Sequence, residues 1–319
     1  MKTLTCFLSI LAVAFGHAAN PIFIDRFTAD PAAIVHEGTV YLYTGHDEAR
    51  PRESYRMHDW LCYSSKDMRT WTPHGPLLSV KDFAWATKDA YAAHVVEKEG
   101  RFYWFVSIEH NATRPGKAIG VAVADSPLGP FKDARGSALV TADMTAKGKH
   151  AWEDIDPAIF VDANGGAWLF WGNLNCYYAK LKPSMTELDG PIKEVTGLTG
   201  FTEAPWVHQC GDTYYLSYAS GFPEKISYAT APSIEGPWTF RGLVSEGAFN
   251  SNTIHQSIIE FNGQWYFIYH NGGIQSGGPL GEGGSYRRAV CIDYLYHEPD
   301  GSIRRILQTT EGVDLPPKR

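Results

Sequence analysis

The chain has 319 residues, 13% of them aromatic, with 31 Gly and 19 Pro, which favours short strands joined by turns over long helices. This length accommodates one large β domain or two smaller ones. The net charge is −7 and there is no basic run, which argues against nucleic acid or an anionic membrane as a partner.

The N-terminus has the pattern of a secretory signal peptide. Met1-Lys2-Thr3 is followed by an apolar run over residues 4–15 and then by small residues that end at Ala19. The run is too short to span a bilayer, and its alternative interpretation is a first core strand or helix. We expect residues 1–19 to be removed, which predicts a secreted or periplasmic protein.

Removal of that segment leaves four cysteines with no CxxC spacing: Cys62, Cys176, Cys210 and Cys291. An exported protein can pair such cysteines, but the sequence does not determine the pairing. Four buried thiols acting as small apolar residues are the alternative that we prefer.

Five segments of the remaining chain share one pattern, in which a strand leads through a turn glycine into an aromatic-rich strand. An aromatic residue stands three positions after each glycine, and the glycines are Gly38, Gly100, Gly165, Gly211 and Gly263. Turns over residues 65–71, 125–131, 231–238 and 300–301 predict further strands in four of the repeats. Repeats of roughly four strands predict an all-β, five-bladed β-propeller that fills residues 20–319 as a single domain.

The innermost strands of a propeller run in one direction along the central channel, so their equivalent starting positions form a ring. Counting eight residues back from each turn glycine, or nine in the third repeat with its longer turn, gives Asp30, Ala92, Asp156, Glu203 and His255. Each residue alone has an ordinary explanation, because Asp-Pro and Glu-Ala-Pro often start a strand. Three carboxyls and a histidine in one register are harder to dismiss, because clustered like charges destabilise a fold.

Such a ring suits the hydrolysis of a glycosidic bond. Two carboxyls across a cleft can act as acid and base, and a third carboxyl raises the pKa of the acid. A general acid must keep its proton near neutral pH, and the third carboxyl allows this by raising the pKa of the acid.

The motifs at these positions resemble family 43 glycoside hydrolases, five-bladed propeller enzymes that act on arabinose- and xylose-containing polysaccharides. The matching motifs are Ala29-Asp30-Pro31, Asp154-Ile155-Asp156-Pro157-Ala158 and Thr202-Glu203-Ala204-Pro205. The resemblance implies that Asp30 is the general base, Glu203 the general acid and Asp156 the group that raises the pKa of Glu203 and orients it. It also implies inversion at the anomeric carbon, with the base and the acid roughly 6.5–9.5 Å apart.

The same resemblance suggests two further residues of the site. His255 matches a channel histidine that lies beside a calcium ion, which makes calcium the implied metal and His255 its neighbour; a core histidine is the alternative. Arg288 matches an arginine that hydrogen-bonds sugar hydroxyls, whereas a surface arginine is its ordinary interpretation. Arg287 alternates with Arg288 on the strand and should face the other way. No organic cofactor is implied.

Three remaining features concern the rim of the pocket. Trp85 stands where family members place a sugar-stacking aromatic residue, with core packing as an equal alternative. Phe222 is a second candidate for the lip of the pocket. Residues 45–60 form a long insertion that can shape a pocket, and we expect its His46-Asp47 and His58-Asp59 pairs to be part of a solvated loop.

The sequence therefore predicts an inverting exo-glycosidase that releases terminal α-L-arabinofuranosyl or β-D-xylosyl units from hemicellulose saccharides. An endo-acting arabinanase would share the three carboxyls, and a fructan-acting propeller enzyme fits the motifs less well. A non-catalytic sugar-binding propeller would keep the aromatic residues but has no need of three carboxyls in register. The oligomeric state is left open.

Overall fold

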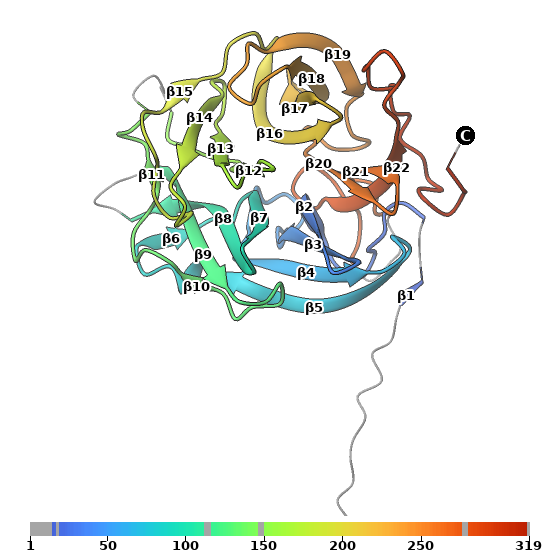
Figure 1. The fold of residues 1–319 in the computed structure, drawn as a ribbon. Helices are drawn as coiled ribbons and strands as arrows, with labels where there is room; N and C mark the ends of the chain where they lie inside the picture. The colour runs from blue at the N-terminus through green and yellow to red at the C-terminus, as the bar shows by residue number, and fades with distance from the viewer. Residues whose placement is uncertain (1–14, 17–18, 112–115, 146–149, 276–279, 318–319) are drawn as a thin grey trace, which may run out of the picture.

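The computed structural model describes residues 15–16, 19–111, 116–145, 150–275 and 280–317. Within these residues the strands form five antiparallel sheets arranged in a ring (Figure 1). The first two sheets contain β1 (Phe15–Gly16), β2 (Thr28–His36), β3 (Thr39–His46), β4 (Asp59–Ser65) and β5 (Thr70–Ser79), and then β6 (Ala86–Lys88), β7 (Ala93–Lys98), β8 (Arg101–His110), β9 (Lys117–Ala124), β10 (Lys132–Asp133) and β11 (Val140–Thr141). A 3-10 turn, η1, covers Val80–Asp82.

The other three sheets follow in chain order around the ring. They contain β12 (Ala158–Val161), β13 (Ala167–Trp171), β14 (Tyr177–Leu181) and β15 (Lys193–Glu194); β16 (Phe201–Cys210), β17 (Thr213–Ser220), β18 (Lys225–Ala231) and β19 (Thr239–Ser245); and β20 (Gln256–Phe261), β21 (Gln264–Asn271) and β22 (Ala289–Leu295). The inner strands contact one another in the order β2, β7, β12, β16, β20 and back to β2. The predicted five-bladed β-propeller is confirmed.

The five predicted turn glycines each join the first and second strands of a blade. All have positive φ, for example 70° at Gly38 and 77° at Gly263, a region that other residues enter only with strain. Large aromatic side chains then fill the space between blades. Trp60 and Trp104 are buried between blades one and two, and Trp171 is buried between blades two and three.

The fifth blade departs from the expected four strands, since its sheet has three in the part of the chain that the structure describes. The predicted turn at Asp300-Gly301 is present, but it closes only an isolated bridge between His297 and Ile303. The segment over residues 20–28 lies along β22 instead, with the Ile22 N–H donating to the Val290 carbonyl at 2.9 Å. Because this segment leads directly into β2, it ties the last blade to the first.

Most of the predicted signal peptide, residues 1–14 and 17–18, lies outside the described residues. Phe15 and Gly16 form the short strand β1 beside β5. None of the described residues belongs to a helix long and apolar enough to cross a membrane.

The four remaining cysteines are free thiols in the described structure. Cys62, Cys176 and Cys291 are buried and Cys210 is half-buried. Their burial agrees with the interpretation of these residues as small apolar side chains.

Candidate active site

The predicted ring lies where the backbone leaves regular strand geometry. Asp30 has a φ of 47° at a bulge in β2, and Asp156 has a φ of 58° just before β12. Ala204, beside Glu203, has a φ of 52° in an irregular part of β16. Bulges re-aim side chains and leave backbone N–H groups without a partner in the sheet. Three positive φ values therefore occur where the carboxylates meet, and strained backbone of this kind is common at functional sites.

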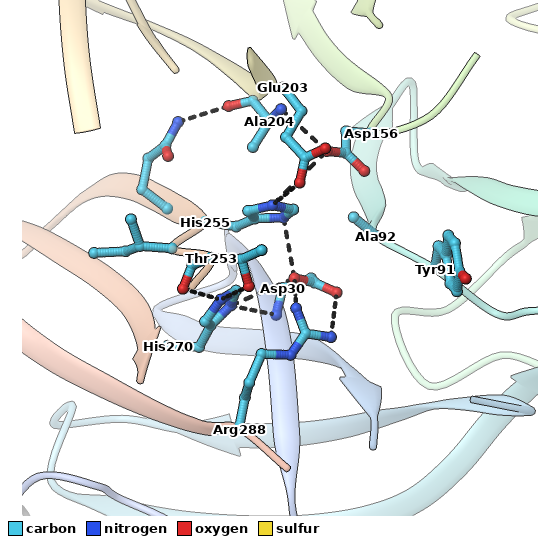
Figure 2. Close-up of polar contacts among 12 residues, drawn as sticks. Asp30, Tyr91, Ala92, Asp156, Glu203, Ala204, Thr253, His255, His270 and Arg288 are labelled. Atoms are coloured by element: carbon cyan, nitrogen blue, oxygen red, sulfur yellow. Dashed lines mark hydrogen bonds and ion pairs between the residues drawn. The ribbon is translucent and has the colours of Figure 1, made fainter. Parts of the chain in front are cut away.

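Side chains from neighbouring strands bond the N–H groups that these irregularities leave free. The Asp30 N–H donates to His270 Nδ1 at 3.1 Å, and the Asp156 N–H donates to Ser107 Oγ at 2.8 Å. The Ala204 N–H donates to the Asp156 carboxylate at 3.0 Å (Figure 2). Since a buried polar group without a partner is costly, these bonds fix the backbone around the ring.

Asp30 is held as a carboxylate by the cations around it. Arg288 Nη1 donates to Asp30 Oδ1 at 2.8 Å, and His255 Nδ1 lies 3.0 Å from the same oxygen (Figure 2). Burial alone would raise the pKa of Asp30, but Arg288 and His255 outweigh burial and hold it well below the ordinary value. Asp30 is thus ionised throughout the neutral range, as a general base must be.

Arg288 is buried rather than on the surface, and it also binds Asp47. Its Nε and Nη2 donate to the two oxygens of Asp47, each at 2.9 Å. The expectation of a solvated loop was wrong for Asp47, which is only 2% exposed. The physical reason is that a buried guanidinium has more N–H donors than Asp30 alone can accept, and Asp47 accepts the others. The same loop brings Tyr55 and Met57 to the pocket wall.

His255 lies between the predicted base and the predicted acid. Its Nε2 is 2.8 Å from Glu203 Oε1, and its Nδ1 contacts Asp30 (Figure 2). Burial would lower the pKa of His255, but Asp30 and Asp156 raise it well above the ordinary value, so the ring is an imidazolium. An imidazole with a hydrogen bond at each nitrogen spans roughly 7–8 Å, which is within the separation expected of an inverting pair.

The pKa shifts of the acidic cluster differ from the sequence-based expectation. Burial raises the pKa of Asp156 well above its ordinary value, and the charges of Glu203 and Asp30 add to the effect. Burial also acts to raise the pKa of Glu203, but the His255 contact outweighs it and lowers this pKa. These opposite shifts mean that Asp156 holds a shared proton more strongly than Glu203 does. The cluster shares its protons, and Glu203 receives one only when its contact with His255 weakens.

Two residues of this cluster were missed from the sequence. The Asn173 side chain donates to Glu203 Oε2, and Glu224 accepts the Ile254 N–H at 2.9 Å. Glu224 lies 3.8 Å from His255, and burial together with the Glu203 charge raises its pKa well above the ordinary value. Asn173 follows β13 and Glu224 follows β17, the second strands of their blades, which end beside the starts of the first strands. A polar residue just after a second strand could therefore have been predicted to reach the ring.

These residues line a pocket of about 470 Å³ at one mouth of the central channel. Asp30, Asp156, Glu203, His255 and Arg288 all contribute to it, so the structure brings the predicted residues together. Pockets that bind small ligands commonly have this size and a few converging polar groups.

The two predicted aromatic contacts have different outcomes. Phe222 lines the pocket and is 73% exposed, which is consistent with a position on the lip. Trp85 instead packs in the core between blades one and two, where its ring is near Phe83 and its Nε1 donates to Asp133 at 3.0 Å. Its stacking role is thus not supported, because the indole is only 6% exposed. Trp152, which is 53% exposed and lines the pocket, is an aromatic residue that sequence analysis overlooked.

The centre of the ring has the features of a cation site. One ligand atom from each of Asp156, Glu203 and His255 lies within 4.8 Å of the others. A small cavity of about 30 Å³ lies in the channel below and is also lined by Gln256, whose Oε1 is buried without a hydrogen-bond partner. Carboxylate and amide oxygens are ligands that calcium prefers, whereas the His255 imidazolium has no free lone pair and would lie beside such an ion rather than bind it.

A five-bladed propeller with two opposed carboxyls and a bridging imidazolium at the floor of a pocket defines a class of protein. Opposed carboxyls at this separation are the machinery of a glycoside hydrolase. The family comparison agrees, because residues 18–303 match the glycosyl hydrolases family 43. The chain belongs to that family.

Individual relatives cover nearly the whole chain. A xylosidase/arabinosidase 43A from Humicola insolens is 29% identical over 89% of this chain and 98% of its own. A calcium-free β-xylosidase/α-arabinofuranosidase from a compost metagenome, crystallised with xylotriose, is 28% identical over 92% and 98%, with a TM-score of 0.81. An α-L-arabinofuranosidase from Clostridium thermocellum is 33% identical over 92% and 98%, with a TM-score of 0.73. These likenesses favour the predicted exo-glycosidase over the alternatives considered above.

Proposed function

We propose that this protein releases single β-D-xylosyl or α-L-arabinofuranosyl units from the ends of hemicellulose-derived saccharides, with inversion at the anomeric carbon. The observation that carries the proposal is His255, which separates Asp30 from Glu203 by one imidazole at the floor of the pocket. A pocket with this pair at its floor can accommodate the end of a saccharide chain. The substrates of the relatives named above support the choice of pentose units.

In the proposed reaction Asp30 takes a proton from a water molecule, whose oxygen attacks the anomeric carbon. Its low pKa keeps the carboxylate free of a proton in the neutral range, so that it can accept one. Glu203 gives a proton to the departing oxygen. Asn173 and His255 hold the two oxygens of Glu203, and the neutral Asp156 beside it is the local source of that proton.

The test is hydrolysis of p-nitrophenyl β-D-xylopyranoside and p-nitrophenyl α-L-arabinofuranoside by the purified protein. Proton NMR of the first product then reads the anomer. We expect turnover of at least one glycoside, with the opposite anomer formed first. Retention, or activity confined to linear arabinan, would contradict the proposal.

We expect Asp156→Asn to move the alkaline limb of the pH–rate profile toward lower pH by about one unit. The Asp156 carboxyl supplies a shared proton, and once ionised it repels a charge on Glu203 and so raises the pKa of that acid. An asparagine supplies neither effect, so the acid loses its proton at lower pH. Asp30 carries no proton in this range, so the acid side of the profile should not change. An unchanged kcat/KM profile on a xyloside or an arabinofuranoside would contradict this role.

We also propose that calcium is the ion of the central channel, held by the amide oxygen of Gln256 and by water. When bound, the ion would add positive charge beneath the acidic cluster. Metal analysis of protein dialysed against calcium should give about one ion per chain, and calcium should raise the thermal midpoint more than magnesium does. Protein that stays calcium-free under these conditions would refute the proposal.

Export is the remaining proposal. The pattern of residues 1–19 supports a secreted or periplasmic location. Mass spectrometry of the mature protein from its host should place the new N-terminus near Ala19 or Asn20. An intact Met1 would contradict it.

A further inference from the structure

One wall of the pocket contains a charged cluster that the reaction described above does not use. Asp89, Glu109 and Lys117 line the pocket from blade two. The Lys117 ammonium donates to Asp89 and lies 3.0 Å from Glu109 Oε2. Asp89 has a φ of 67° in the loop before β7, a conformation that most residues adopt only with strain. We call these three residues the blade-two triad.

A series of cation and aromatic contacts connects the triad to the base. Lys117 Nζ lies 4.1 Å from the centre of the Tyr91 ring, and the Tyr91 and Tyr55 rings meet edge to face at 5.7 Å. The Arg288 guanidinium lies 5.1 Å from the Tyr55 ring. The wall of the pocket is therefore continuous from Asp30 and Arg288 to the triad, and its aromatic members are held between two cations.

Burying charged groups costs free energy even when they are paired, so the burial of the triad needs an explanation. The Lys117 side chain is 6% exposed, while Asp89 and Glu109 are 16% and 21% exposed. Glu109 and Lys117 are also cross-strand partners in β8 and β9, which offers a purely structural explanation for that pair. Asp89 belongs to no strand and has no such explanation. It reaches the pair from a loop, and it lines the pocket.

The ring position of blade two leaves room beside the triad. Four blades carry Asp30, Asp156, Glu203 and His255 at this position, but blade two carries Ala92. Its methyl group lines the pocket next to Tyr91 (Figure 2). The space that a longer side chain would fill is open to a sugar ring lying between the base and the acid.

We propose that the blade-two triad is a specificity-determining subsite that hydrogen-bonds hydroxyl groups of the terminal sugar, a neutral pentose unit lying over Ala92. The carboxylates of Asp89 and Glu109 accept from the hydroxyls, and Lys117 fixes both carboxylates. Lys88 lies 3.7 Å from Asp89 at the rim, so two ammonium and two carboxylate groups balance among the described side chains. This balance favours a neutral sugar over a charged one. The proposal rests on the proposed function for the position of the sugar.

The test compares Asp89→Asn and Lys117→Met with Lys193→Met, a matched control that removes a lysine from an exposed ion pair with Glu235. Substrates are the aryl glycosides that the wild type hydrolyses and their monodeoxy analogues, all with one leaving group. We expect Asp89→Asn to lower kcat/KM about 10–100-fold on the parent sugar, because a charged acceptor for a buried hydroxyl is lost. On the analogue lacking the recognised hydroxyl, wild type and Asp89→Asn should be equal within about threefold.

A structural role would instead lower activity by the same factor on every analogue and would reduce the thermal midpoint. That result, or a variant with unchanged kcat/KM on the parent sugar, overturns the proposal. Should Lys117→Met fail to fold, Asp89→Asn decides, since it keeps the size and one oxygen of the side chain.

Failure of the proposed function gives a different result from failure of the subsite proposal, because the wild type would then hydrolyse neither glycoside. Calorimetric titration with free D-xylose and L-arabinose then tests the triad without turnover. A wild type that binds one sugar about 10-fold more tightly than Asp89→Asn supports the subsite, and equal binding or no binding overturns it.

Discussion

Asp30→Ala is expected to lower kcat about 10³–10⁴-fold on every glycoside, whatever its leaving group. The reason is that activation of water is needed to break a bond to a good or a poor leaving group alike. Steady-state rates on 2,4-dinitrophenyl and alkyl glycosides of the same sugar measure the effect. Substantial turnover of the dinitrophenyl substrate would remove Asp30 from the role of base.

Asp47 provides a matched control for Asp30→Ala, because both residues are carboxylate partners of Arg288. Asp47 binds the same guanidinium from the other side, yet it is not among the residues that line the pocket in the described structure. Asp47→Ala should therefore lower the thermal midpoint as Asp30→Ala does, because each leaves a buried cation short of a partner. Its kcat should fall far less. Azide should also rescue Asp30→Ala by entering the space of the lost carboxylate, and it should not change Asp47→Ala.

Spacing in the sequence was enough to predict the fold and the ring. Turn glycines recur once per blade, and the inner strands all run the same way, so one count from Gly38 or Gly211 places Asp30 and Glu203 at one mouth. That count needs no knowledge of side-chain packing. It therefore finds all five ring positions, with one extra residue in the third repeat, but it does not predict the three strands of the fifth blade.

Contacts made by loops could not be predicted in the same way. Asp47 seemed solvated because nothing near it in sequence is its partner; Arg288, 241 residues away, is. Trp85 is a residue type that often stacks on sugar rings, but the packing between blades one and two determines which way its indole points. The pKa order was also inaccessible, since it depends on how closely His255 approaches Glu203 rather than Asp156.

Glu203→Gln is expected to lower kcat/KM about 10³-fold on xylobiose or an alkyl glycoside and only about tenfold on a 2,4-dinitrophenyl glycoside. A poor leaving group needs the proton of Glu203, whereas dinitrophenolate departs without it. A plot of log kcat/KM against leaving-group pKa should therefore become steeper in the variant.

The matched control is Glu224→Gln, in the same cluster. Burial and the Glu203 charge raise the pKa of Glu224, so this side chain is neutral in the free protein and glutamine reproduces both its charge and its acceptance of the Ile254 N–H. Glu224→Gln should thus keep most of its activity and an unchanged slope. A steeper slope in Glu224→Gln with a normal slope in Glu203→Gln would transfer the role of acid to Glu224, because only the group that protonates the leaving oxygen makes the rate depend on leaving-group basicity.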